Sequence, residues 1–525
     1  MFSPEPIEFP DPHLAAAIRE ELGLAPDEPI TQKKLDELGK LSTREHSISD
    51  LTGIEKITHL TSLSINSGQI NSGQIADITP LAGLTNLTTL SLNSNPITDI
   101  APLSGLKELT DLSLQGNRIQ DITPLAGLVQ LEKLSLWNNK IKDLTPVVNL
   151  SQLHTLSIAN NEIRDITPLA KLSKLTRLVL SSNQISDLTS LSKLTQLRSL
   201  SLEGNQISDL NLTPLSGLTR LRKLSLDGNQ INEIEHINGL EELSDLGLEN
   251  NQIQDLTPYV SFFEGLPKLT ALMLNDNQIS DITPLEKLTQ LKTLNLYNNK
   301  INDIAPLANM TQLEPLNLYN NKIYDIASLA NMAQLKKLDL SNNKISDITS
   351  LAGLTQLSQL NLRNNQISNI TSLAELTRLF FLYLDRNQIV DISPIYNLTN
   401  LTTLSLEENQ IGDITPIKNL TKLLSLDLSN NQITDITAII GLTKLINLRF
   451  DNNKIINIPQ FKENFQLLGI WLNGNQIRDI SPIENLKQLK VLHIQENPIQ
   501  DMSQIRKLRK QLPDLRIYAD IEDAR

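Results

Sequence analysis

The stretch LTTLSLNSNPITDIAPLSGL, residues 87–106, decides the fold because the same pattern returns every 22 residues along the chain. Residues 109–128 read LTDLSLQGNRIQDITPLAGL, and residues 131–150 read LEKLSLWNNKIKDLTPVVNL. The shared unit is LxxLxLxxNxIxDIxPLxxL, and a fixed period of this kind is the signature of a repeat architecture. Its asparagine marks 19 copies: Asn95, Asn117, Asn139, Asn161, Asn183, Asn205, Asn229, Asn251, Asn277, Asn299, Asn321, Asn343, Asn365, Asn387, Asn409, Asn431, Asn453, Asn475 and Asn497.

Each part of the unit predicts a local structure. In LxLxx the leucines alternate with polar residues, which is typical of a short strand with one buried face. The asparagine can hydrogen-bond backbone groups of the turn that follows, so we expect an asparagine ladder in the interior. In DITPLAGL, an Asp or Thr N-cap and a proline at the first helical position predict a short helical turn. Because 22 residues leave little room for a full return helix, we expect 3₁₀ turns there.

This pattern is that of the leucine-rich repeat. We predict an α/β repeat solenoid, a right-handed leucine-rich repeat horseshoe with a concave parallel β-sheet, mostly 3₁₀ turns on the convex side and a helical N-terminal cap. The expected organisation is an N-terminal helical cap over residues 1–45, a solenoid of about 20 repeats over residues 46–500, and a C-terminal cap and tail over residues 501–525.

The two ends carry signals for caps. Asp11 and Pro12 open an amphipathic helix that should stop at Gly23, and Thr31 is the expected N-cap of a second short helix. At the other end, SQIRKLRKQL (503–512) predicts a terminal helix, and RIYADIEDAR (516–525) reads as a polar tail.

Three irregularities interrupt the repeat. The unit SDLNLTPLSGL (208–218) is longer by two residues, and TPYVSFFEGLPKL (257–269) is long enough for an α-helical turn. Phe262 and Phe263 should pack under that turn, with an exposed docking position as the alternative. Pro315 has no N–H to donate and should weaken one strand pairing.

Composition restricts the class of partner. The chain has 46 basic and 59 acidic residues, a net charge of −13 and a pI near 5.1, which disfavours a general grip on nucleic acid. It has no cysteine, so disulfides, thiolate nucleophiles and cysteine-based zinc sites are excluded. No stretch has the run of about 18 apolar residues that a membrane helix needs, so we expect no membrane insertion.

The expected location follows from the N-terminus as written. It shows no basic segment followed by an apolar run, so we expect a cytoplasmic protein, or a secreted or surface protein if an export signal has been removed. We expect a monomer.

The sequence gives no sign of catalysis. The six histidines are scattered over the cap and unrelated units, so they suggest neither a triad nor a metal cluster. Aspartates such as Asp99, Asp121 and Asp143 recur in nearly every unit, whereas a catalytic site needs a unique place, so we interpret them as caps of the helical turns. We therefore expect a non-enzymatic protein with no cofactor and no metal.

The segment NSGQINSGQI (66–75) places Gly68 and Gly73 at the spacing of a phosphate loop. Gln74 and Ile75 follow where such a loop needs Lys and Ser or Thr, and no long helix comes next. We interpret the segment as a duplication of NSGQI that loops out of the first full coil.

Information in a repeat protein lies where the copies differ. Most exposed strand positions carry Ser, Asn, Thr, Asp or Gln, and a few carry aromatic side chains, arginine or methionine. Such residues on a polar sheet are typical of interface hot spots. An acidic trio, Glu203, Asp227 and Glu249, could meet basic side chains of a partner or form a solvated stripe. The predicted partner-binding residues are Trp137, Met273, Tyr297, Tyr319, Arg363, Phe381, Tyr383, Arg386, Arg449 and Trp471.

The sequence resembles the bacterial internalin-type class of leucine-rich repeat proteins. The likeness rests on the repeat and on FPDPHLAAAIREELGL (9–24), ITQKKLDEL (30–38) and SISDLTGIEKITHLTSL (47–63), which look like that family's cap and first strands. The resemblance implies a scaffold that binds a protein or peptide partner through aromatic and charged residues of its concave face. The alternative is a regulatory subunit that binds and controls an intracellular enzyme such as a phosphatase.

Overall fold

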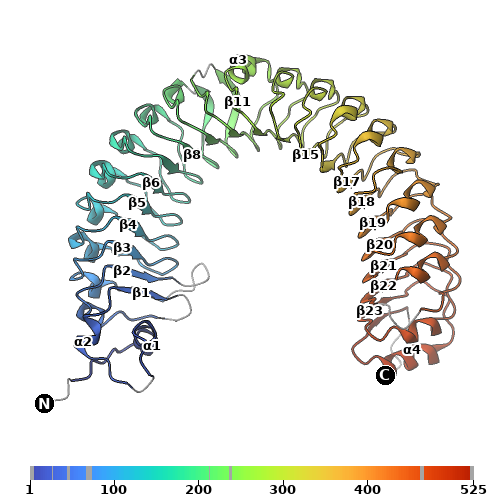
Figure 1. Cartoon of the computed structure of the whole chain (residues 1–525), viewed down its shortest axis with the longest axis horizontal. Helices are drawn as coiled ribbons and strands as arrows, with labels where there is room; N and C mark the ends of the chain where they lie inside the picture. Colours follow the sequence, from blue (N-terminus) through green and yellow to red (C-terminus); the bar gives the residue numbers. More distant parts are fainter. Residues whose placement is uncertain are drawn as a thin grey trace. The chain divides into compact units, whose positions relative to one another are not determined.

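A computed structural model of the chain describes residues 5–25, 28–43, 48–66, 74–211, 213–235, 239–461 and 466–520. Its contacts divide the chain into two compact units. Unit 1 comprises Met1–Ile253 with Pro258–Leu269, and unit 2 comprises Gln254–Thr257 with Thr270–Arg525. In each unit the strands line the inner side of the stacked coils and the short turns lie on the outer side (Figure 1).

Unit 1 begins with two helices, α1 (Pro12–Glu21) and α2 (Gln32–Leu35), and α1 packs against the first strand. The Asp11 side chain caps α1 by accepting hydrogen bonds from the backbone N–H groups of His13 (2.8 Å) and Leu14 (3.1 Å). Parallel strands then pair in chain order: β1 (Lys40–Thr43), β2 (Ser62–Ile65), β3 (Thr89–Ser91), β4 (Asp111–Ser113), β5 (Lys133–Ser135), β6 (Thr155–Ser157), β7 (Arg177–Val179), β8 (Ser199–Ser201), β10 (Lys223–Ser225) and β12 (Asp245–Gly247).

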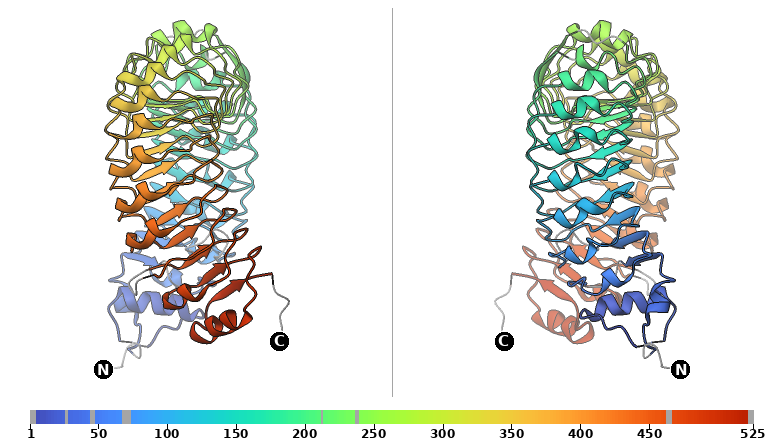
Figure 2. Two further views of the ribbon diagram at one scale, coloured as in Figure 1. Left: turned by 90° about the vertical axis from the view of Figure 1, so that its right-hand side faces the viewer. Right: turned by 90° about the vertical axis from the view of Figure 1, so that its left-hand side faces the viewer.

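Unit 2 continues the same architecture, and the coils of each unit are stacked side by side (Figure 2). Its elements are parallel strands that pair in chain order, with one helix before the last strand. They are β13 (Ala271–Met273), β14 (Thr293–Asn295), β15 (Pro315–Asn317), β16 (Lys337–Asp339), β17 (Gln359–Asn361), β18 (Phe381–Tyr383), β19 (Thr403–Ser405), β20 (Ser425–Asp427), β21 (Asn447–Arg449), β22 (Gly469–Trp471), β23 (Val491–His493), α4 (Met502–Gln511) and β24 (Arg516–Tyr518).

The return segment of most coils is a single 3₁₀ turn, as the repeat length predicted. These turns are η1 (Ile54–Lys56), η2 (Thr79–Leu81), η3 (Ala101–Gly105), η4 (Thr123–Leu125), η5 (Thr145–Asn149), η6 (Thr167–Lys171), η7 (Thr189–Lys193), η8 (Thr213–Leu215), η9 (Thr257–Tyr259), η10 (Thr283–Leu285), η11 (Ala305–Leu307), η12 (Ala327–Asn331), η13 (Thr349–Gly353), η14 (Thr371–Leu373), η15 (Ser393–Asn397), η16 (Thr415–Asn419), η17 (Thr437–Gly441) and η18 (Ser481–Asn485).

The turns are held by the aspartates interpreted as caps. In η4, for example, the Asp121 side chain accepts a hydrogen bond of 2.8 Å from the Thr123 backbone N–H. The hydrogen bonds from Thr123 lower the pKa of this exposed carboxyl. The recurring Asp row is therefore structural, as predicted, but the N-cap position itself belongs to the residue after each Asp, which is Ile122 in η4.

The asparagine ladder runs through the interior of both units. The side-chain amide of Asn365 donates to the carbonyl groups of Leu340 (3.0 Å) and Leu362 (3.1 Å), and its oxygen accepts from the backbone N–H of Ile345 (3.0 Å). One side chain thus joins two successive coils and satisfies buried backbone groups that have no strand partner. The residue before each ladder asparagine has a positive φ, near 52° at Asn364, which explains the frequent Asn or Gly there.

The irregular coils largely follow the sequence. Phe262 and Phe263 belong to helix α3 (Val260–Glu264) and are buried, so the alternative of an exposed docking position is wrong. Strands β14 and β15 pair at only two positions, Leu294–Leu316 and Asn295–Asn317, and the pair that would include Pro315 is missing, as predicted. Most of NSGQINSGQI, residues 67–73, lies outside the described residues.

Two features were not foreseen. The longer unit forms strand β9 (Ser208–Asn211), which pairs with β11 (Gln230–Glu235) in a separate small sheet. The prediction of a polar tail was wrong for Arg516–Tyr518, because these residues form β24 and pair with β23. Alternation in RIYAD places the half-buried Ile517 opposite the buried Leu492, in line with the inward-facing row of the sheet.

Candidate functional site

The strand register of unit 2 aligns one residue per coil into a row across the sheet. We call it the central row; its C-terminal part consists of Tyr383, Ser405, Asp427, Arg449, Trp471, His493 and Tyr518. Residues 22 apart in the chain thereby become neighbours, about 4.8 Å apart, as in any parallel sheet. The row carries both aromatic and charged side chains.

A stack of four side chains ends the central row. The Arg449 guanidinium lies 4.4 Å from the centroid of the Trp471 ring, and the Trp471 and His493 rings stack at 5.8 Å with an interplanar angle of 16°. The Tyr518 ring then stacks on His493 at 4.2 Å and 12°. Cation–π and stacking contacts of this kind hold large side chains in place before a partner arrives.

Gly469 makes room for this stack. A Cβ atom at Gly469 would lie 2.3 Å and 2.4 Å from two outer atoms of the Trp471 ring. The indole therefore lies over the start of its own strand, where any side chain would displace it. This glycine is a positioning residue for Trp471.

A second cluster lies at β17 and β18. The Arg363 guanidinium is 4.3 Å from the centroid of the Tyr383 ring, and Arg363 also pairs with the Asp385 carboxylate. Phe381, on the same strand as Tyr383, is 40% exposed. The sequence had singled out Arg363, Phe381 and Tyr383, and the structure brings Arg363 and Tyr383 into contact, with Phe381 two residues before Tyr383 on the same strand.

The remaining predicted residues are arranged in smaller groups. Tyr297 and Tyr319 have ring centroids 6.5 Å apart at 46°, and the Asn295 side chain donates to the Met273 sulfur at 3.2 Å. Trp137 lies in unit 1, so it is not part of the unit 2 face.

Arg386 has a left-handed backbone, with φ of 54°, and pairs with Glu408 at 3.3 Å. Glu408 has a similar φ of 50°. An arginine in this conformation costs about 1 kcal/mol compared with the Asn or Gly of other coils. The fold alone therefore does not favour a charged residue at this position.

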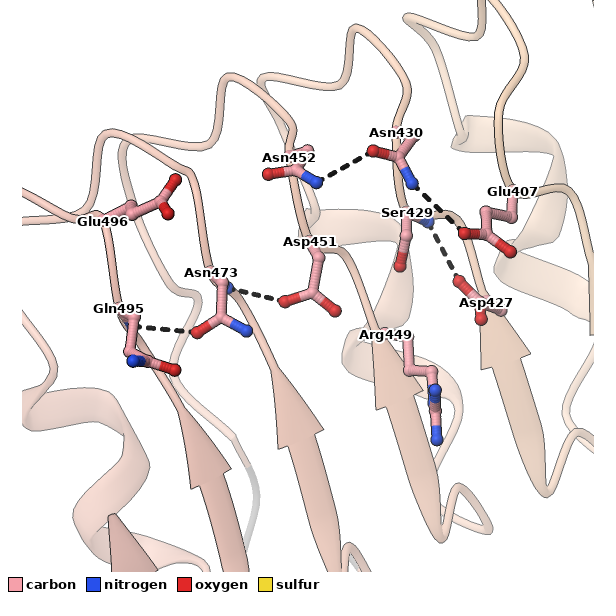
Figure 3. Close-up of a pocket in the computed structure, with 10 residues that line it drawn as sticks. All are labelled: Glu407, Asp427, Ser429, Asn430, Arg449, Asp451, Asn452, Asn473, Gln495 and Glu496. Atoms are coloured by element: carbon pink, nitrogen blue, oxygen red, sulfur yellow. Dashed lines mark hydrogen bonds between the residues drawn. The ribbon is translucent and has the colours of Figure 1, made fainter. Parts of the chain in front are cut away.

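A hollow of about 440 Å³ lies beside the central row, over the ends of strands β19–β23 (Figure 3). Four carboxylates line it, those of Glu407, Asp427, Asp451 and Glu496, together with the single guanidinium of Arg449. Its amides and hydroxyl belong to Ser429, Asn430, Asn452, Asn473 and Gln495.

Hydrogen bonds hold the walls of the hollow. The Asp451 carboxylate accepts from the backbone N–H of Asn473 at 2.8 Å, and the Asn430 amide donates to Glu407 at 3.2 Å. Burial raises the pKa of Asp451 and of Glu407, and Asp427 nearby raises both further. Among the described residues, none of the four carboxylates forms an ion pair within 4.0 Å.

His493 and Tyr518 are site residues that the sequence analysis missed. Burial lowers the pKa of His493; Asp451 opposes this shift and Arg449 adds to it. The signal was present, because VLHI and RIYA place both side chains at the position between two inward-facing residues. The signal at Tyr518 was overlooked because its unit lacks the repeat's asparagine and because RIYA was taken for a tail, whereas His493 stands in an ordinary position of the last full repeat.

The acidic trio of unit 1 is partly structural. The Asp227 carboxylate accepts from the Glu249 backbone N–H at 2.9 Å, and a Cβ at Gly247 would lie 2.5 Å from both Asp227 carboxylate oxygens. Burial raises the pKa of Asp227. Its carboxylate is thus partly occupied in holding the next coil, and is not simply part of a solvated stripe.

The side chains that the site presents are aromatic, cationic and acidic. Within the described ranges, no group of three or more His, Asp or Glu side chains is arranged to hold a metal ion. No helix in the same ranges is long and apolar enough to cross a bilayer. The exposed residues offer stacking, cation–π and ionic contacts over a broad surface.

Stacked coils with an asparagine ladder and a decorated strand face define a repeat scaffold, and the sequence profiles of known families agree. The family profile described as "Leucine Rich repeats (2 copies)" matches residues 85–127, 129–171, 267–309, 289–331, 311–353, 333–375, 377–419 and 466–507. The description "Leucine rich repeat" matches residues 151–207, 173–231 and 195–253, and a third profile of that kind matches residues 419–436. The chain belongs to the leucine-rich repeat family.

Within this family the chain is internalin-like. An internalin (InlF) from Listeria monocytogenes is 33% identical over 80% of this chain and 96% of its own, with a TM-score of 0.39. The relationship to internalins rests on the sequence identity and the shared repeat unit, and not on the structural overlap that the TM-score measures. No curated protein matches the sequence.

Two plant receptors show the same fold at lower identity. The plant peptide hormone receptor RGFR1, in complex with RGF2, is 21% identical over 89% of this chain and 81% of its own, with a TM-score of 0.68. The Arabidopsis receptor kinase HAESA, in complex with the peptide hormone IDA and the co-receptor SERK1, is 21% identical over 88% of this chain and 87% of its own, with a TM-score of 0.63.

Proposed function

We propose that this chain is a non-enzymatic scaffold that binds a protein or peptide partner on the strand face of unit 2. The observation that carries the proposal is the stack of Arg449, Trp471, His493 and Tyr518, which presents prearranged aromatic and cationic groups on an otherwise polar sheet. Side chains held in place lose less conformational entropy on binding, which raises affinity for the same contacts.

Further features support this proposal. The Arg363–Tyr383 contact adds a second anchor on the same sheet, and Tyr297 and Tyr319 extend the face toward the start of unit 2. Arg386 adds a charged group in the coil of Tyr383. The leucine-rich repeat is a scaffold for protein interactions, and RGFR1 and HAESA have this fold and were solved in complex with peptide hormones. Arg, Trp and Tyr are also the residue types that dominate interface energetics.

The test is affinity capture with the full-length protein, followed by mass spectrometry and direct measurement of the captured partner's Kd. Arg449→Ala with Trp471→Ala should weaken binding by about 100-fold, since two hot-spot residues are removed. Tyr324→Ala is the matched control, because this tyrosine is 61% exposed but lies outside the strands. Equal affinity of the double variant and the control would refute the assignment of the face.

A further inference from the structure

At the N-terminal ends of strands β18–β22, four of five neighbouring coils carry an apolar side chain that is exposed or half-buried. We call this the edge row; it consists of Phe380, Thr402, Leu424, Ile446 and Leu468, the residues just before strands β18–β22. Phe380, Leu424 and Leu468 are 44%, 39% and 41% exposed. Backbone hydrogen bonds of 2.8 to 2.9 Å link each residue of the row to the next, so the side chains follow one another along the sheet.

The fold does not require apolar residues in the edge row. From residue 61 to residue 490, the same backbone position in the other described coils carries polar or charged residues: Thr61, Thr88, Thr110, Glu132, His154, Thr176, Arg198, Arg222, Ser244, Thr270, Lys292, Glu314, Lys336, Ser358 and Lys490. Gly39 takes the position in the first coil, and Leu515, which is buried, takes it in the last. Exposed apolar groups gathered in neighbouring coils mark an interaction surface, whereas single ones need no explanation.

Charge indicates what covers the row. The hollow with Glu407, Asp427, Asp451 and Glu496 lies at the other end of the same strands, and its one cation, Arg449, is held over Trp471. From Leu424 to Asp427 the chain advances three residues, or about 10 Å in a strand. A partner that covers both features must therefore carry apolar groups on one flank and positive charge on the other.

Spacing indicates the conformation of the partner. Neighbouring coils are about 4.8 Å apart, whereas an α-helix brings a side chain to the same flank about every 5.4 Å. An extended chain repeats the same side only about every 6.6 Å, so it falls out of phase with the coils within about two strands. A helix is about 10 to 12 Å across with its side chains, which matches the distance from Leu424 to Asp427.

From these observations we propose that strands β18–β22 bind one amphipathic, basic α-helix of a protein partner, laid across the strands. Its apolar flank packs on Phe380, Leu424, Ile446 and Leu468, and its Lys or Arg side chains point toward the carboxylates of the hollow (Figure 3). The distance from Phe380 to Leu468 is four coils, about 19 Å, which a helix of about 13 residues spans. This inference rests on the proposed function and adds the class of partner.

The experiment selects ligands without assuming their sequence. A display library of random peptides of about 18 residues, long enough for the helix and its ends, is enriched on the full-length protein. We expect enriched peptides to be basic, with Leu, Ile, Phe or Met at positions i, i+3 or i+4, and i+7, and to gain helical circular dichroism on binding. Enriched peptides that are acidic, or that lack helical periodicity, would overturn the inference, as would the absence of enrichment.

Variants of the edge row then test where the selected peptides bind. Leu424→Ser, Ile446→Ser and Leu468→Ser together should weaken binding at least about tenfold, because the apolar flank loses its contacts. Glu132→Ser, His154→Ser and Thr176→Ser are the matched control, since they alter the same position in three coils of unit 1 and should leave affinity within about twofold. An equal effect of the two triple variants would overturn the inference.

The carboxylates of the hollow are tested separately, through the salt dependence of peptide binding. Glu407→Gln with Asp451→Asn should weaken the selected peptide about tenfold at low salt and much less in about 0.5 M NaCl, because salt screens ionic contacts. An affinity that does not respond to these changes would refute the role of the hollow. If the edge-row variants leave binding intact while Arg449→Ala with Trp471→Ala abolishes it, the helix inference fails and the proposed function stands; if neither matters, both fail.

Discussion

Replacing Gly469 by alanine tests the geometry of the aromatic stack without removing any aromatic side chain. The new Cβ would lie 2.3 Å from the nearest Trp471 ring atom, whereas carbon atoms in contact stay about 3.5 to 4.0 Å apart. The ring must therefore move by about 1.2 Å or more. Because the close atoms are at the far end of the side chain, we expect the indole to swing away and the backbone to remain in place.

The energetic terms are small and partly opposed. Moving the indole forfeits the Arg449 contact, about 0.5–1 kcal/mol, and the His493 stack, about 0.5–1.5 kcal/mol. Replacing glycine by alanine also stabilises the folded protein by about 0.4–1 kcal/mol, because it restricts the unfolded chain. The expected net loss of unfolding free energy is about 1 kcal/mol, so the protein should remain folded while the site changes.

Fluorescence reports the change directly. The chain has two tryptophans, so Trp137→Phe leaves Trp471 as the single emitter. In that background Gly469→Ala should shift the emission to longer wavelength and increase quenching by iodide, and it should weaken binding of the captured partner. Gly412→Ala is the matched control, because a Cβ there meets no atom within 4 Å. Unchanged emission and quenching in Gly469→Ala would show that the indole does not lie over Gly469.

Two further predictions concern stability. Asn365→Ala should lower the unfolding free energy by about 3 kcal/mol, because it leaves the Ile345 N–H and the Leu340 carbonyl without their partner. Gln366→Ala, at an exposed position, is the control and should change the unfolding free energy by no more than about 0.5 kcal/mol. Equal urea midpoints of the two variants, or unchanged hydrogen exchange at the Ile345 amide, would contradict the role of the ladder. Since the folded pKa of His493 is lowered, the unfolded state binds its proton first, so stability should be full above the ordinary pKa of about 6.5 and fall as the pH decreases toward 5. His493→Gln should remove this component from urea titrations at both pH values, and an identical pH dependence in the variant would refute it.

Much of the coil could be predicted because its information is local. The alternation of LxLxx, the asparagine and the capped turn each determine a short element through hydrogen bonds within or next to one coil. The ladder contacts of Asn365 and the Asx turn at Asp121 are of this kind. Pro315 was also predictable, since a missing N–H has the same effect in any parallel sheet.

The site was predictable only in part. The identities of Arg449 and Trp471 were visible as exceptions to the repeat, but their mutual contact depends on side-chain conformations that no pattern encodes. His493 and Tyr518 were missed because one lies in an ordinary position of the last full repeat and the other follows a helix that separates it from the repeats. The edge row was overlooked since its apolar residues are common ones, and only the exposure of Phe380, Leu424 and Leu468 in neighbouring coils makes them unusual.

By itself, the sequence determined the repeat family, the strand and turn within each coil and the buried ladder, because a strict 22-residue period repeats one set of local interactions. The tertiary structure decided which distant side chains act together. Pairing in register brings residues 22 apart within reach of one another, extends the stack to Tyr518 through β24, and places an apolar edge opposite an acidic hollow. Those relations arise from the packing of one coil on the next, which composition and period leave open.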